Sequence, residues 1–100
     1  MSVNQFMEAN LRVIRDEIII NIPNEEFDSH EFIRNFAKRF ERDYVEFLSS
    51  YRLEPFRIVH AQIGSFLSEH QRLLNIRDIG SAISSNIFGI ESSNEKWIKV

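Results

Sequence analysis

The chain has 100 residues, no cysteine, and a net charge of −3 from 12 Lys and Arg against 15 Asp and Glu. Half of such a chain could not bury an adequate core, so the length predicts a single domain, residues 1–100. The absence of cysteine excludes a disulfide framework, a thiolate zinc site and a cysteine nucleophile. With 43% hydrophobic residues, no apolar run of membrane-spanning length and no secretory signal pattern, the sequence predicts a soluble, cytoplasmic domain with no membrane partner.

Charge is distributed unevenly along the chain. Residues 1–32 hold two Arg against seven acids (−5), residues 33–77 hold eight Lys and Arg against five acids (+3), and residues 78–100 come to −1. A net negative chain is unsuited to coating nucleic acid without sequence preference, because that binding comes from phosphate neutralisation. A single basic face in the middle segment fits these numbers, and so does an ordinary set of solvated helix surfaces.

Apolar residues near the start of the chain follow a helical repeat. The members of this stripe are spaced by three or four positions: Val3, Met7, Leu11, Ile14 and Ile18. We therefore expect an amphipathic helix from Val3 to about Asn21, ending before Pro23. The run 18–22 is also rich in β-branched residues, so a short strand is the alternative there.

A second helix is predicted by its start signals. Asp28 fits the N-cap position, and Glu31 stands three residues later, as in a capping box. Phe27 and Phe32 fit a hydrophobic staple across this cap. Apolar residues then keep helical spacing at Ile33, Phe36, Phe40, Tyr44, Phe47 and Tyr51. We expect one long helix from about Ser29 to Ser50 or Tyr51.

A third helix is predicted from Pro55 to Leu74, because proline is tolerated in a first helical turn. Its apolar stripe consists of Phe56, Val59, Ile63, Phe66, Leu67, His70 and Leu74. The following segment, 75–85, is compatible with a turn and short helix or with extended structure. Two β-prone runs, 86–90 and 96–100, then flank the polar residues 91–95 and predict a C-terminal hairpin.

The predicted fold is thus mainly α, with three principal helices and a short C-terminal β-hairpin. This is the element order of a winged helix-turn-helix domain. Within it, 28–33 resembles the start of a second helix, 60–68 resembles a recognition helix, and 96–100 resembles a returning wing strand. The sequence departs from the pattern in its long second helix, its glycine-free turn at 52–54 and its acidic wing loop with Glu91 and Glu95.

The polar side of the third predicted helix suggests a function. An arginine-flanked strip lies opposite the apolar stripe and consists of Arg57, Ala61, Ser65, Ser68 and Arg72. Small side chains permit a close approach to a major groove, and Arg can bond guanine edges or phosphates. The hypothesis is a DNA-binding or regulatory module that contacts double-stranded DNA through Arg57, Ser65, Ser68 and Arg72. An ordinary solvent-facing or protein-contacting helix fits the same strip.

The alternative hypothesis is a protein-interaction or assembly module that binds another protein or a second copy, with no nucleic acid and no catalysis. It rests on the aromatic second helix and on Phe88 and Trp97 in the C-terminal segment. If those two rings are exposed, they form an apolar contact patch. If Trp97 is buried, it closes the core instead.

No motif predicts catalysis, a cofactor or a metal. The three glycines are widely separated, and neither Gly-x-Ser-x-Gly nor His-Glu-x-x-His occurs, so we expect no enzyme. His60 and His70 are ten residues apart, about 15 Å along one helix, and cannot share a metal. His30 lies in a carboxylate-rich stretch that suits a divalent cation, but capping of the second helix explains those carboxylates more simply.

Overall fold

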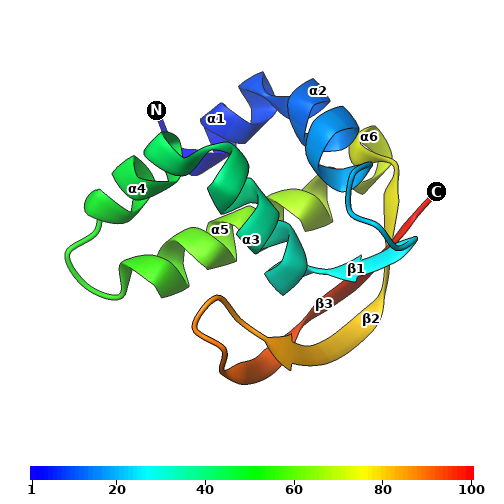
Figure 1. Ribbon diagram of the computed structural model, residues 1–100. Coiled ribbons are helices and arrows are strands. Elements are labelled where there is room, and N and C mark those ends of the chain that lie inside the picture. Colours follow the sequence, from blue (N-terminus) through cyan, green and yellow to red (C-terminus); the bar gives the residue numbers. More distant parts are fainter.

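The computed structural model describes residues 1–100 as a mainly helical chain with a small three-stranded antiparallel sheet (Figure 1). Helices make up 55% of the residues, which confirms the predicted class. Each of the three predicted helices is, however, divided into shorter pieces, so the chain has six α-helices and one π-helix. None of these helices combines the length and apolar character needed to cross a bilayer.

The first helical segment consists of α1 (Val3–Ala9), α2 (Leu11–Val13) and the π-helix η1 (Ile14–Ile19). It bends at Asn10, where φ is −114° and the side-chain Nδ2 donates to the carbonyl of Phe6. The prediction of one continuous helix is therefore wrong, and so is the strand alternative for Ile18 and Ile19. The wider π turn points three isoleucines, at 14, 18 and 19, into the core.

The second segment consists of α3 (Ser29–Arg39) and α4 (Glu41–Ser49), separated at Phe40, where φ is −121° and ψ is 49°. The predicted single helix is wrong at this residue. The Phe40 ring packs edge-on against Phe6 with centroids 4.9 Å apart, and it also contacts Phe36. The bend lets the apolar sides of both helices, including Tyr44, reach the same core.

The predicted cap at the start of α3 is confirmed in part. Asp28 Oδ1 accepts a hydrogen bond of 2.9 Å from the backbone N–H of Glu31. The reciprocal bond from the Glu31 side chain does not form, so the capping box is incomplete. Asp28 is also the last residue of a strand, β1 (Glu26–Asp28), and its backbone pairs with Lys96. A complete capping box forms instead at α1, between Ser2 and Gln5.

The third segment consists of α5 (Pro55–Glu69) and α6 (Gln71–Leu74), so the predicted helix from Pro55 to Leu74 is also wrong as one cylinder. The bend is at His70, with φ −118°. The His70 ring stacks on Phe66 at 3.8 Å, and its Nδ1 lies 3.0 Å from the Phe66 carbonyl. This stacking holds the ring against the core, on the side that its place in the predicted apolar stripe indicates.

The sheet has the order β1-β3-β2, with β2 spanning Ile76–Ser85 and β3 spanning Glu91–Lys99. The predicted hairpin exists, but its turn lies at 86–90, which was predicted as a strand, and residues 91–95 belong to β3. Asn86 determines this position, because its Oδ1 accepts from the N–H groups of both Phe88 and Ile90. Strand β1 had no counterpart in the sequence prediction.

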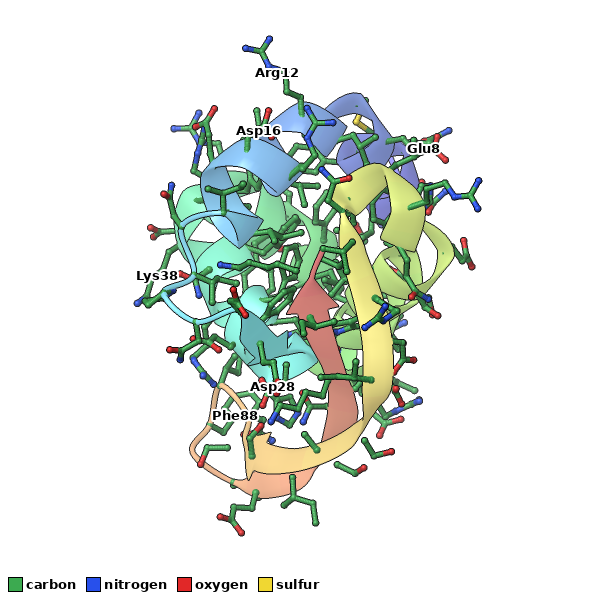
Figure 2. All side chains as sticks on the ribbon, turned by 90° about the vertical axis from the view of Figure 1, so that its right-hand side faces the viewer. Glu8, Arg12, Asp16, Asp28, Lys38 and Phe88 are labelled. Carbon is green, nitrogen blue, oxygen red and sulfur yellow. The ribbon has the colours of Figure 1, made fainter.

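The core contains 21 buried hydrophobic residues drawn from the helices and the sheet. Trp97 on the central strand β3 is fully buried, and its Nε1–H donates to Ser29 Oγ at 3.0 Å. Of the two alternatives predicted for Trp97, its burial confirms the one in which it closes the core rather than forming an exposed patch with Phe88. Phe88 remains 56% exposed on the hairpin turn (Figure 2).

Candidate functional site

The arginine-flanked strip is exposed along its whole length, but it is not on one helix. Arg57, Ala61, Ser65 and Ser68 lie on α5, whereas Arg72 lies on α6, beyond the bend at His70. The two arginines therefore do not share one straight helical face. A rigid helix that inserts both ends of the strip into one groove is not the geometry observed.

One arginine of the strip is paired with a carboxylate, and a second carboxylate lies beside the strip. Arg57 Nη2 donates to Glu54 Oε2 at 2.9 Å, and this contact lowers the pKa of Glu54 and raises the pKa of Arg57. Glu69 is exposed one residue after Ser68. Two cations and two carboxylates thus occupy the strip and its ends, and their charges balance. Phosphate binding favours an uncompensated positive face, which this strip does not present.

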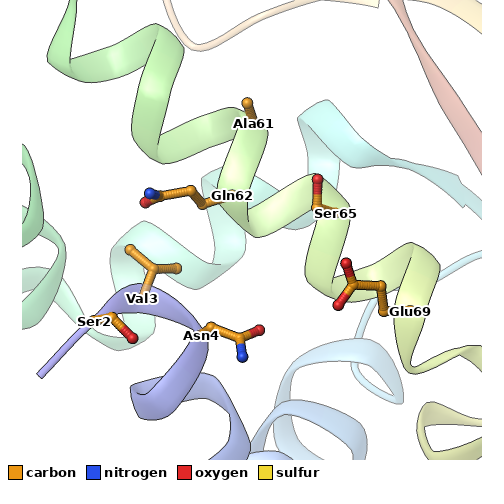
Figure 3. Close-up of a pocket in the computed structure, with 7 residues that line it drawn as sticks. All are labelled: Ser2, Val3, Asn4, Ala61, Gln62, Ser65 and Glu69. Carbon is orange, nitrogen blue, oxygen red and sulfur yellow. The ribbon is translucent and has the colours of Figure 1, made fainter.

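The middle of the strip borders a shallow hollow of about 260 Å³ between α5 and the start of α1 (Figure 3). Ser2, Val3 and Asn4 form one side of the hollow, and α5 forms the other through Ala61, Gln62, Ser65 and Glu69. Any ligand that contacts Ser65 from this side therefore also meets the Glu69 carboxylate. The hollow suits neutral or cationic groups better than phosphate.

A different surface is formed by the β2–β3 hairpin. Four large apolar side chains are exposed on it, with 40% of Ile79, 75% of Ile83, 56% of Phe88 and 63% of Ile90 accessible. The same stretch, 78–95, contains three acids and no Lys or Arg. We call the following set the hairpin surface: Asp78, Ile79, Ile83, Phe88, Ile90, Glu91 and Glu95.

Two carboxylates of the hairpin surface are close enough to affect the protonation of one of them. The pKa of Glu95 is raised by a side-chain hydrogen bond with Asp78 and, secondarily, by the charge of that carboxylate. Such a pairing of like charges is relieved when a cation binds nearby. The acidic part of the hairpin surface is therefore suited to a positively charged group.

Strand β2 is at the edge of the sheet and pairs with β3 alone. Side chains occupy backbone groups near both of its ends: Gln71 Oε1 accepts from the Asp78 N–H, and Arg34 Nη1 donates to the Ser85 carbonyl. The N–H of Gly80 is bonded to Asp78 Oδ1. Between these contacts, residues 81–84 form a short uncapped edge that includes the exposed Ile83.

His30 connects α3 to the hairpin. Its Nδ1 lies 2.9 Å from Ser84 Oγ, its Nε2 lies 3.3 Å from Ser92 Oγ, and its backbone N–H donates to Asn94 Oδ1 at 3.0 Å. Both ring nitrogens are thus used to hold the two strands. No group of three or more His, Asp or Glu side chains is placed to hold a metal ion.

A second histidine contact was not predicted. Tyr44 Oη on α4 and His60 Nε2 on α5 are 2.6 Å apart, and the two rings are stacked. Burial raises the pKa of Tyr44 to about 12. Burial also lowers the pKa of His60, with a further contribution from the charge of His30. In the sequence, the position of His60 at the edge of the apolar stripe was the available sign of this environment.

Comparisons with known protein families, with curated proteins and with solved structures find no match to this chain.

Proposed function

We propose that this chain is a protein-interaction module, and that its hairpin surface binds a partner protein through apolar and basic side chains of that partner. The observation that carries the proposal is the composition of residues 78–95, which expose four large apolar side chains beside three carboxylates and no cation. Several large apolar side chains exposed on one hairpin favour a contact surface. Charge complementarity then selects a basic partner and excludes acidic ones.

The edge of β2 supports a specific mode of contact. Residues 81–84 have a free strand edge, and strand addition to such an edge supplies main-chain hydrogen bonds to the partner. Alternate side chains of an added strand face the same side of the sheet. Ile83, Glu91 and Glu95 share one face of the hairpin, since the register pairs Glu91 with Ser85 and Glu95 with Ser81. The expected ligand is an extended segment that places apolar and basic residues in turn at every second position, on one face.

Two labelled eight-residue peptides test this proposal by fluorescence anisotropy. In one, every second residue is in turn Lys and Ile and the others are Ser, so that Lys and Ile share one face of the strand. In the other, Glu replaces Lys. We expect the Lys peptide to bind and the Glu peptide not to bind, with affinity for the Lys peptide falling as salt increases. The Ile83→Ser variant should bind the Lys peptide about tenfold more weakly, since it loses a buried aliphatic contact of roughly 1.5 kcal/mol.

Val45→Ser is the matched control, because Val45 is 53% exposed on α4, outside the hairpin surface. It should bind like the unchanged chain. Equal binding of the two peptides, or equal binding by the Ile83→Ser and Val45→Ser variants, contradicts the proposal. Light scattering of the chain alone gives a further check, because a stable dimer would assign the surface to a second copy.

DNA binding or regulation by a winged-helix-like fold is the second candidate. Two observations favour it: helical segments precede a C-terminal hairpin, and every residue of the arginine-flanked strip is exposed. In this function Arg57 and Arg72 contact the duplex, while Ser65 and Ser68 allow close approach. The carboxylate of Glu54, which is paired with Arg57, and the exposed carboxylate of Glu69 are the reason we rank it second.

A labelled duplex titrated at two salt concentrations tests the second candidate. If it is correct, affinity falls steeply with salt, and Arg72→Ala weakens binding and reduces that salt dependence. Arg52→Ala, an exposed arginine outside the strip, is the control. Absence of binding, or binding insensitive to salt, excludes this function for the chain.

A further inference from the structure

A second hollow, of about 300 Å³, lies where the β2–β3 turn meets the first turns of α3 and α5. We call it the α3–α5 hollow. Residues from all three elements line it, including His30, Phe56, Arg57, His60, Asn86 and Phe88. No Asp or Glu is among the lining residues, although the chain as a whole is net negative. Its volume is at the lower end of the range for small-molecule sites.

Two polar groups of this hollow, on His60 and Asn86, are hydrogen-bond donors without partners in the chain, whereas His30 and Ser92 are bonded to each other. The Tyr44 hydroxyl retains its proton and has no acceptor other than His60 Nε2, so that nitrogen accepts and the proton of the neutral imidazole is on Nδ1. The Nδ1–H makes no hydrogen bond within the chain. The amide nitrogen of Asn86 is likewise unused, because its Oδ1 makes both turn contacts.

Arg57 adds a positive charge at the edge of the hollow. Its Nη2 is bonded to Glu54, while its other guanidinium nitrogens have no partner in the chain. An arginine fork matches the two oxygens of a carboxylate. Because Glu54 already balances part of its charge, this guanidinium is suited to the single negative charge of a carboxylate rather than to the two of a phosphate.

Aromatic rings form the apolar wall. Phe56 and Phe88 meet edge to face with centroids 4.9 Å apart, and the His60 ring lies 5.8 Å from Phe56. Rings arranged in this way accept a further planar ring in a stacked or edge-on position. The hollow thus combines a flat apolar wall with a set of donors.

We propose that the α3–α5 hollow binds a small aromatic carboxylate, with its ring against Phe56 and Phe88 and its carboxylate bonded to Arg57 and His60 Nδ1–H. Because Phe88 belongs to the hairpin turn, the bound ligand holds that turn against α5. The site shares only Phe88 with the hairpin surface, and its other ligand contacts come from Phe56, Arg57 and His60 of α5, so the two proposals are tested by different variants.

Nuclear magnetic resonance titration of the ¹⁵N-labelled chain tests it with sodium benzoate as the probe. We expect benzoate to shift the amide resonances of residues 56, 60 and 86–88. Benzamide, which keeps the ring and lacks the charge, and acetate, which keeps the charge and lacks the ring, should each bind at least about tenfold more weakly.

Two arginine variants provide the matched comparison. Arg57→Gln should weaken benzoate binding by about tenfold. Arg52→Gln should leave it unchanged, because Arg52 is exposed outside the hollow. Neither residue is in the hairpin surface, so binding of the Lys peptide should be unaffected in both variants. Equal affinity for benzoate and benzamide, equal loss in both variants, or no saturable shift overturns the proposal.

Discussion

Tyr44 and His60 show how one contact between residues 16 positions apart sets the chemistry of both. Their hydrogen bond joins α4 to α5 in a half-buried position, where a charged imidazole loses part of its hydration. The pKa of His60 is therefore lower in the folded chain than its ordinary value of 6.5. The unfolded chain binds a proton at this site more readily, so acid favours unfolding.

We expect the free energy of unfolding to decrease as the pH falls from 6.5 through the lower folded pKa of His60. His60→Gln removes the titrating group and should remove this part of the pH dependence. Urea unfolding of both proteins, repeated from pH 7.5 to about pH 5, measures the difference. Parallel curves for the two proteins over this range would show that His60 does not contribute.

At the scale of secondary-structure elements, each of the three predicted helices bends at one residue: Asn10, Phe40 and His70. The apolar stripe continues across each bend, so the local sequence pattern alone does not reveal it. The bends allow short helices to wrap around one core. A related local constraint occurs in β2, where the register shifts between Asp78 and Gly80 and Gly80 has φ +113°.

The chain therefore offers two glycine substitutions of opposite expected sign. Gly80→Ala should destabilise the fold by about 1–3 kcal/mol, because alanine is strained at positive φ. Gly64→Ala, within α5, should stabilise it by about 0.5–1 kcal/mol, because an added Cβ meets no atom within 4 Å. Chemical denaturation of both variants measures the changes. A stabilising Gly80→Ala would contradict the observed bulge.

For the whole molecule, β3 is the element that the rest depends on most. It is the central strand, and both β1 and β2 pair only with it. It also carries Trp97, which is fully buried and bonded to Ser29 at the start of α3. A strand near the end of the chain thus completes a core that begins with Val3.

A chain ending at Ser85 should consequently fail to fold cooperatively, although it keeps every helix. It loses the pairing of both remaining strands and the largest side chain of the core. The full chain should unfold in one transition, with Trp97 fluorescence and far-ultraviolet circular dichroism coinciding. A cooperative thermal transition in the shortened chain would show that the helices form a sufficient core alone.

Part of the candidate site was accessible from the sequence. Exposure of Arg57, Ser65, Ser68 and Arg72 follows from helical periodicity, because i to i+3 and i+4 spacing decides which side faces the core. The neighbouring carboxylates balance the positive charge of that strip and make it less suited to phosphate. Their role depends on side-chain contacts such as Arg57 to Glu54, which spacing does not specify.

Local patterns determined the mainly helical class, the cap at Asp28 and the presence of a C-terminal hairpin, because each depends on residues a few positions apart. Contacts between distant residues decided the remainder. Glu26–Asp28 is a strand because β3, near the other end of the chain, pairs with it. The tertiary structure also places α3, α5 and the turn around one hollow and leaves Phe88 exposed while burying Trp97. Long-range packing assigns these environments, and residue type or local spacing does not encode them.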